Sequence, residues 1–205
     1  GIDADAFEPY VLTGGSIDKA RSLVVVRQFL AVVASGKQWP TIFMQAVLNS
    51  VPFHADRRHL ITLLAALTGP YSTVYPYSTS VRSSNLTGVR AEKNLASRLA
   101  ARSTKFMLAY EDNIVLGEFA AKPKVQKYFT ESEFYQLFVE QYHQVEIKTV
   151  GNYVTAVCRQ PRGIHKTRLR DAIAFEFDLP YPGERRMGLV DEALAAFGQR
   201  LGVAL

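Results

Sequence analysis

The spacing of apolar side chains predicts helices along most of the chain. Ser16 is a good N-cap, and the apolar stretch over 17–35 ends at Gly36, as a helix would. Pro40 suits the first turn of a second helix, because proline is tolerated at that position. The same periodicity predicts further helices over 41–50, 56–67, 86–103, 131–144 and 189–201.

Strands are expected only in the second half of the chain. The Gly151-Asn152 pair between two apolar runs is typical of a two-residue hairpin, so we expect paired strands over 145–150 and 153–159. A second hairpin is expected from 105–110 and 114–119; the alternative is that the preceding helix continues to Tyr110. Residues 172–178 alternate like one more strand, after a basic loop over 160–170.

Residues 69–84 differ from their surroundings, because they are rich in proline, tyrosine, serine and threonine. This composition favours an extended linker. We therefore expect a helical subdomain with an N-terminal arm over 1–69, a linker loop over 70–84, and a second subdomain over 85–205. The predicted fold class is α+β and predominantly helical, with a helical N-terminal subdomain plus a small antiparallel sheet with packing helices.

Composition excludes several classes of protein. With 48% hydrophobic and 21% charged residues, the chain is not a disordered one. The single cysteine, Cys158, rules out an internal disulfide and a zinc site made of several cysteines, and its apolar neighbours predict a buried, inert thiol. No apolar run is long enough to span a membrane, so we expect no membrane contact and a location in the cytoplasm or a virion rather than secretion.

Positive charge is concentrated in two windows. Residues 70–110 hold six basic and one acidic side chain, net +5, and residues 151–175 hold five and one, net +4. Arginine dominates both windows, and its planar group binds phosphate with two hydrogen bonds. We therefore expect these cations to bind nucleic acid through its phosphates; they are Arg90, Lys93, Arg98, Arg102 and Lys105, and Arg159, Arg162, Lys166, Arg168 and Arg170.

Three tyrosines, Tyr71, Tyr75 and Tyr77, stand just before the first basic window. Exposed aromatic rings beside cations can stack on unpaired bases, so single-stranded RNA is the favoured partner. The apolar N-terminal helices also exceed what one small subdomain needs, which predicts a homo-oligomer. Together these features favour a non-enzymatic structural protein of the coat or nucleoprotein type, a viral protein without a cofactor or metal. A bare solvated basic face is the simpler interpretation.

Two alternatives stay open. Glu146 and Lys148 lie two apart on an expected strand, so they share a side; with Asp112 they could form a Mg²⁺-dependent nuclease site. The second alternative is a protein–protein interaction module whose basic face meets an acidic partner. His54 and His59 lie too far apart on a helix to bind one metal, and no nucleophile motif or glycine-rich phosphate loop is present.

Overall fold

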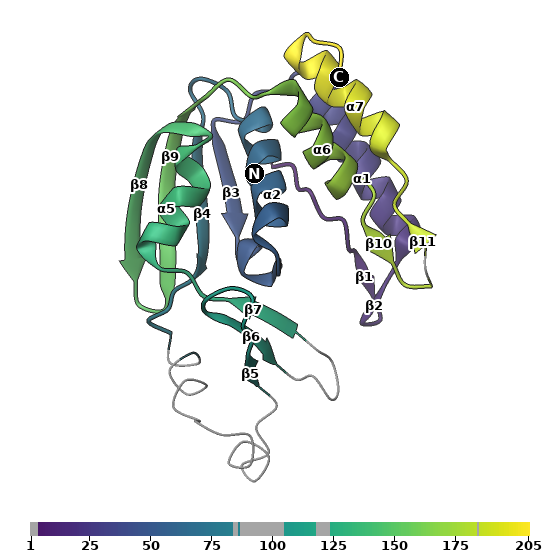
Figure 1. Cartoon of the computed structure of the whole chain (residues 1–205). Coiled ribbons are helices and arrows are strands. Elements are labelled where there is room, and N and C mark those ends of the chain that lie inside the picture. Colours follow the sequence, from purple (N-terminus) through teal and green to yellow (C-terminus); the bar gives the residue numbers. More distant parts are fainter. Residues whose placement is uncertain (1–3, 84–85, 87–104, 118–123, 184) are drawn as a thin grey trace.

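A computed structural model describes residues 4–83, 86, 105–117, 124–183 and 185–205 of the chain. A four-stranded sheet lies on one side of the molecule, and a layer of helices covers one of its faces (Figure 1). A smaller three-stranded sheet sits below one edge of the large sheet, and a group of helices extends the helical layer beyond it.

The large sheet has the strand order β3-β4-β9-β8. β3 (Thr41–Gln45) and β4 (Thr73–Thr79) are parallel, whereas β9 (Tyr153–Pro161) runs antiparallel to both β4 and β8 (Tyr142–Val150). The parallel pair is joined by α2 (His54–Leu67), which crosses over one face. Parallel neighbours need such a crossover, which makes this an α/β arrangement.

β4 lies inside the sheet although its sequence, Thr-Val-Tyr-Pro-Tyr-Ser-Thr, is typical of a loop. Val74, Pro76 and Ser78 are buried, and the tyrosines between them face the other way. Pro76 has no N–H to donate, and it has no register partner on β9, where the pairing of β4 continues from Val74 directly to Tyr77. The strand tolerates the proline because its outer residues pair normally on both sides.

The face of the sheet beneath α2 and α5 (Glu131–Val139) forms one hydrophobic core. Ile61 and Leu64 of α2 and Phe134 and Phe138 of α5 pack there against inward side chains of the strands. Cys158 belongs to this core; burial raises its pKa to about 12, which confirms the expected inert thiol.

A second core joins the two ends of the chain. It packs α1 (Lys19–Ala34), α6 (Lys166–Glu176) and α7 (Val190–Leu201) against one another and against α2. The N-terminal arm is held on this core by Phe7, whose ring lies 5.0 Å from Phe29. Two short hairpins flank it: β1 (Leu12–Thr13) with β2 (Ser16–Ile17), and β10 (Pro180–Tyr181) with β11 (Arg185–Arg186).

The small sheet is attached where β3 and β4 end. It contains β5 (Phe106–Met107), β6 (Ile114–Gly117) and β7 (Lys124–Lys127) in antiparallel order. Ser80, just after β4, bridges Phe129, just after β7. The short helix η1 (Leu48–Ser50) after β3 also contacts β7. The small sheet therefore sits over the carboxyl edge of the parallel pair.

The expected fold class, α+β and predominantly helical, was wrong. Helices and strands are present in comparable amounts, 38% and 29%, and the large sheet contains a parallel pair. Residues 41–50 form β3 and η1 rather than a helix, and β4 replaces most of the expected loop over 69–84. Residues 172–178 are mostly helical, because Leu169, Ala172, Ile173, Glu176 and Phe177 are buried with helical spacing.

Other elements were predicted well. The hairpin at Gly151-Asn152 is β8 and β9, and the helices expected over 17–35, 56–67 and 189–201 are α1, α2 and α7. The hairpin of β5 and β6 was expected too, whereas the helix over 131–144 ends at Val139 and leads into β8. The helix expected over 86–103 lies outside the described residues, except Leu86. The division into 1–69, 70–84 and 85–205 stays a prediction.

Within the described ranges, no helix is both long and apolar enough to cross a membrane.

Candidate functional site

A cavity of about 480 Å³ lies between the N-termini of α2 and α5 and the small sheet. α2 begins after β3, and α5 begins after β7 of the small sheet, which is attached where β3 and β4 end. The cavity therefore lies at the carboxyl edge of the parallel pair (Figure 1). In α/β sheets this edge is where ligands bind. The lining residues are Phe53, His54, Arg57, Tyr110, Glu111, Lys127, Phe129, Ser132, Glu133, Gln136 and Leu137.

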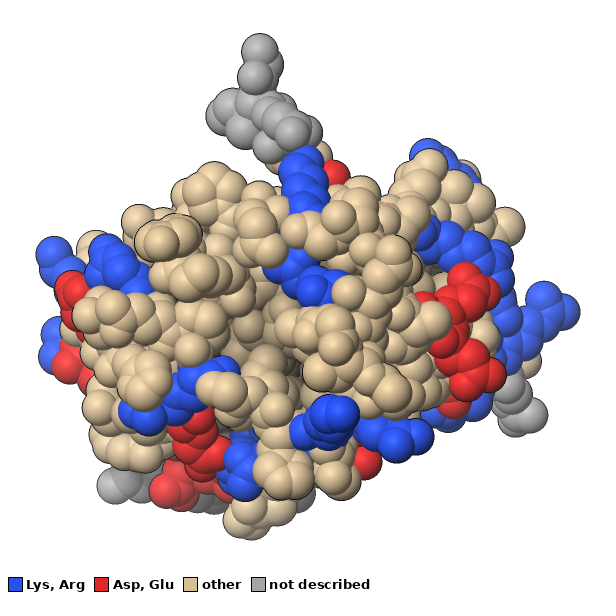
Figure 2. Space-filling view, turned by 90° about the horizontal axis from the view of Figure 1, so that it is seen from above, with Lys and Arg blue, Asp and Glu red and all other residues tan. Residues whose placement is uncertain are grey.

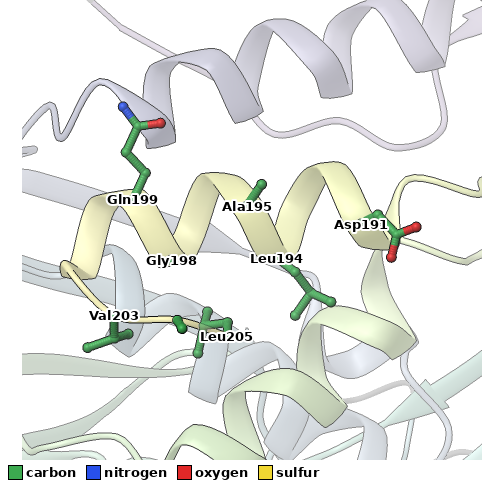
Figure 3. Close-up of a pocket in the computed structure, with 8 residues that line it drawn as sticks. Asp191, Leu194, Ala195, Gly198, Gln199, Val203 and Leu205 are labelled. Atoms are coloured by element: carbon green, nitrogen blue, oxygen red, sulfur yellow. The ribbon is translucent and has the colours of Figure 1, made fainter.

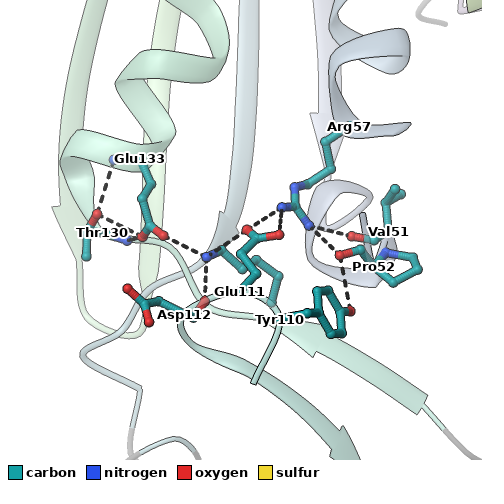
Figure 4. Close-up of polar contacts among 9 residues, drawn as sticks. Val51, Pro52, Arg57, Tyr110, Glu111, Asp112, Thr130 and Glu133 are labelled. Atoms are coloured by element: carbon teal, nitrogen blue, oxygen red, sulfur yellow. Dashed lines mark hydrogen bonds and ion pairs between the residues drawn. The ribbon is translucent and has the colours of Figure 1, made fainter. Parts of the chain in front are cut away.

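Arg57 ties three segments together at one end of the cavity (Figure 4). Its Nη1 donates to the carbonyls of Val51, at 2.8 Å, and Pro52, at 3.0 Å, in the turn between β3 and α2. Its Nη2 forms a two-oxygen ion pair with Glu111 of the β5–β6 turn. The arginine thus fixes the small sheet to the start of α2.

Lys127 links the same carboxylate to α5. Its Nζ lies 3.0 Å from Oε1 of Glu111 and 2.7 Å from Oε1 of Glu133, and it donates to the carbonyl of Asp112 at 2.6 Å. The other carboxylate oxygen of Glu133 accepts from the N–H and the hydroxyl of Thr130, both at 2.8 Å, in the capping box that begins α5. We refer to Arg57, Glu111, Lys127 and Glu133 as the four-charge network.

The two signs of charge in this network differ in exposure. The side chains of Arg57 and Lys127 are 0% and 1% exposed, whereas those of Glu111 and Glu133 are 22% and 34% exposed. The ring of Phe129 lies against both cations, 5.7 Å from the guanidinium and 5.5 Å from the ammonium. A molecule in the cavity therefore meets carboxylate oxygens first, with the cations behind them.

The network keeps both carboxyl groups ionised. Burial by itself raises the pKa of Glu111, but hydrogen bonds from Arg57 and Lys127 outweigh it and leave the pKa below its ordinary value. For Glu133 burial is likewise outweighed, by Lys127 and Thr130, and the pKa is lowered. The pKa of Tyr110, beside them, is raised by burial and by the charge of Glu111, so its phenol stays neutral, and its O–H donates to the carbonyl of Pro52 at 3.4 Å.

The carboxylates retain capacity for a ligand. A carboxylate offers about four acceptor sites. Glu111 uses three of these sites, for contacts with Arg57 and Lys127. Glu133 also uses three, for contacts with Lys127 and Thr130. About one site on each is left for a donor from the cavity, while Phe53, Phe129 and Leu137 supply apolar walls.

The tyrosines singled out in the sequence lie elsewhere. Tyr75 and Tyr77 lie on β4 and face away from α2 and α5, on the uncovered side of the large sheet. Tyr71 is exposed in the turn before β4. None of the three lines the cavity.

Those of the expected basic residues that the structure describes do not gather on one surface. Arg159 lies on β9 and pairs with Glu146 at 2.9 Å, whereas Arg162 donates to the carbonyls of Val139 and Tyr142. Lys166, Arg168 and Arg170 lie on α6, on the helical side, where Arg168 is 3.5 Å from Glu140. Lys105 is exposed before β5. The remaining four, Arg90, Lys93, Arg98 and Arg102, lie outside the described residues.

The space-filling view agrees with this dispersion. On the face seen from above, lysine and arginine side chains are scattered singly or in small groups between uncharged surface, and several adjoin acidic side chains (Figure 2). On that face the excess of positive charge does not form one continuous patch.

The residues considered for a nuclease site have different partners in the structure. Glu146 and Lys148 do lie on the same side of β8, as alternation requires, but the Glu146 carboxylate is taken up by Arg159. Asp112 lies in the β5–β6 turn and contributes its backbone carbonyl to Lys127. In the described part of the chain, no three His, Cys, Asp or Glu side chains gather so as to hold a metal ion.

A second hollow, of about 390 Å³, lies between α7 and the C-terminal residues (Figure 3). The chain folds back on α7 after Gly202, and it can do so because Gly198 has no side chain. A Cβ there would lie 2.8 Å from the carbonyl oxygen of Val203. The only charged residue lining this hollow is Asp191, so the hollow offers less chemistry than the cavity at the carboxyl edge.

The sequence reasoning missed the four-charge network. A usable signal was Lys127, which lies two residues after Val125, so that alternation places it on the same side of β7 as an apolar side chain.

Comparison with known proteins gave structural likeness alone. No protein family matches the chain, and no curated protein matches it. One similar solved structure is the PH0226 protein from Pyrococcus horikoshii OT3, with 13% identity and a TM-score of 0.43 over 69% of this chain and 68% of that one. Another is the CcbJ methyltransferase from Streptomyces caelestis, with 13% identity and a TM-score of 0.39 over 69% of this chain and 71% of that one.

The expected coat or nucleoprotein role was wrong, and so was the viral assignment attached to it. The chain has a mixed α/β sheet, and neither of the two similar structures named above is described as a coat protein or a nucleoprotein. Location in a virion is left without support.

Proposed function

We propose that the cavity at the carboxyl edge is the substrate pocket of an α/β enzyme, and that it takes a small molecule with an ammonium group on an apolar body. The observation that carries the proposal is the orientation of the four-charge network, with carboxylates towards the cavity and cations buried behind. The volume lies within the range of small-molecule pockets.

The ligand class follows from the groups that remain accessible. Each carboxylate keeps about one acceptor site, so an ammonium or hydroxyl donor fits, whereas an anion meets two ionised carboxylates. Phe53, Phe129 and Leu137 accommodate the apolar part, and the phenol oxygen of Tyr110, whose O–H donates to the carbonyl of Pro52, adds an acceptor.

Benzylamine is the probe that tests this proposal, with benzyl alcohol and benzoate as its neutral and anionic counterparts. In amide NMR titrations we expect benzylamine to shift the signals of Ser132 and Gln136 and to bind about tenfold more tightly than benzyl alcohol, since its hydrogen bonds to the carboxylates are charge-assisted. Benzoate should leave those signals unchanged. Equal binding of benzylamine and benzoate would contradict the proposal.

Two matched variants locate the binding. Gln136→Trp places a large ring at the cavity lining and should abolish benzylamine binding. Tyr135→Trp changes the neighbouring exposed residue, which does not line the cavity, and should have no effect. Turnover is tested first as methyl transfer, the reaction that the name of the CcbJ enzyme gives for that protein.

A further inference from the structure

The face of the large sheet turned away from α2 and α5 carries aromatic side chains on three neighbouring strands. Phe43 lies on β3, Tyr75 and Tyr77 on β4, and Tyr153 on β9. Their sequence neighbours Ile42, Val74 and Val154 point into the core on the other face. Phe43, Tyr75 and Tyr153 are exposed and Tyr77 is half-buried, so this aromatic face is accessible.

The four rings form two pairs. Phe43 and Tyr75 are register partners whose rings are stacked, with centroids 5.5 Å apart and planes 25° from parallel. Tyr77 and Tyr153 meet edge to face, also at 5.5 Å. Neighbouring strands thus hold the rings in a fixed arrangement before any ligand arrives, which lowers the entropy cost of binding.

The composition of the face argues against a covering layer of helices. Sheets that are covered on both faces are rich in Val, Ile and Leu. The outward positions of these four strands include no Leu or Ile and two valines, Val150 and Val157. Besides the aromatics, the others are Thr, Gln and charged side chains, such as Thr41, Gln45 and Thr73. Tyr and Thr hydroxyls next to accessible rings suit a ligand that is flat, polar at its edges and hydrated.

Two cations border the rings on the same face. Lys148 of β8 stands opposite Thr155 of β9, which in turn stands opposite Tyr77. Arg159 stands opposite Thr73, at the other end of β4, and shares its charge with Glu146. Among the described residues Lys148 forms no ion pair, so its ammonium is available to a phosphate.

We propose that this aromatic face binds a single-stranded nucleic acid. Two or three bases stack on the two ring pairs, and Lys148 and Arg159 contact phosphates of the same strand. Four-stranded sheets with exposed aromatics bind RNA in this way, and base stacking tolerates different sequences. The face and the cavity at the carboxyl edge share no residue, so this proposal is independent of the proposed substrate pocket.

Fluorescence anisotropy with a labelled ten-nucleotide oligouridylate tests the proposal. The wild-type chain should bind it, and Tyr75→Ala or Phe43→Ala should weaken binding about tenfold or more, because each removes a stacking ring. Tyr75→Phe keeps the ring and should stay within about threefold of wild type. The matched control is Tyr135→Ala on α5, a tyrosine with the same 37% exposure as Tyr75, which should bind like wild type.

Further measurements distinguish RNA from DNA and from a duplex, and a nucleic acid from a second copy of the chain on this face. A thymidine oligonucleotide of equal length distinguishes DNA from RNA, and a duplex should not bind, because its bases are already stacked. Equal affinity of wild type and Tyr75→Ala, or no binding by a wild-type chain of native circular dichroism, would overturn the proposal. A dimer in light scattering that Tyr75→Ala dissociates, without RNA binding, would overturn it too and assign the face to a second copy.

Discussion

Helix α2 borders two clusters of buried charge that behave in opposite ways. On one side Arg57 and Lys127 accompany Glu111 and Glu133, and both carboxyl pKa values are lowered. On the other side Glu176 of α6 is buried near Asp56 of α2, and burial followed by the charge of Asp56 raises its pKa to about 7. Burial disfavours the charged form in both clusters, so the presence of a paired cation decides whether the carboxyl pKa is lowered or raised.

The two clusters therefore differ in the charge that they carry at neutral pH. The four-charge network holds fixed charges that connect α2, α5 and the small sheet. Among the described residues no cation pairs with Glu176, and Tyr10 of the N-terminal arm feels its charge. The first cluster keeps its charge at neutral pH, and the second gains its charge there.

Breaking the paired cluster should have the largest effect. Lys127→Met leaves Glu111 and Glu133 without their shared cation, and we expect the free energy of unfolding to fall by about 3–5 kcal/mol in urea titrations. Lys148→Met removes an exposed lysine from the open face and serves as the control, with a change below about 0.5 kcal/mol. A similar loss in both variants would show that the network is no more important than a surface charge.

Neutralising the unpaired carboxyl should have a smaller effect of opposite sign. The folded pKa of Glu176 is raised above its unfolded value, so its contribution to stability is fully present below about pH 4.5 and is lost as the pH rises through 7. Glu176→Gln should therefore be up to about 3 kcal/mol more stable than wild type at pH 8 and nearly equal to it at pH 4. Thermal unfolding across this range measures it.

The control for this comparison is Glu131→Gln, which changes an exposed carboxyl at the start of α5. It should leave the pH dependence of stability as in wild type. Equal stability of Glu176→Gln and wild type at pH 8 would contradict the raised pKa of this carboxyl.

The smallest expected effect concerns the edge of the paired cluster. Thr130→Ala removes the hydroxyl that caps α5 and that donates to Glu133, and should cost about 1 kcal/mol of stability. Ser132→Ala, two residues further on, removes a hydroxyl without a capping role and should cost less than half as much. Urea titrations at pH 7 compare the two, and equal losses would deny the cap its role.

Local chemistry made part of the fold predictable. The Gly151-Asn152 turn fixed the β8–β9 hairpin. Thr130 and Glu133, three residues apart, have the spacing of a capping box at the start of α5. β4 was missed because its proline and hydroxyl residues are those of a loop; only its place between β3 and β9 makes it a strand. α6 was missed because the apolar residues Ile173, Phe175 and Phe177 alternate in sequence, although the positions that are buried have helical spacing.

The candidate site was harder to foresee, because its parts are far apart in the chain. Arg57 and Glu111 are 54 positions apart, and no local spacing connects them. Glu133 was recognised for its capping role, but its bond to Lys127 depends on how the small sheet docks. By contrast Tyr75 and Tyr77 were noticed from composition alone, since exposed aromatics are conspicuous in any segment.

Helix α2 also has a consequence for how the molecule comes apart. Leu63 and Ala66 belong to the core formed by α1, α6 and α7, while Ile61, Leu64 and Ala65 belong to the core beneath the large sheet. Loss of either core would expose apolar side chains that hold the other in place. Denaturation should therefore be cooperative, with one transition for the N-terminal arm, the helices and the strands, and no half of the protein should survive alone.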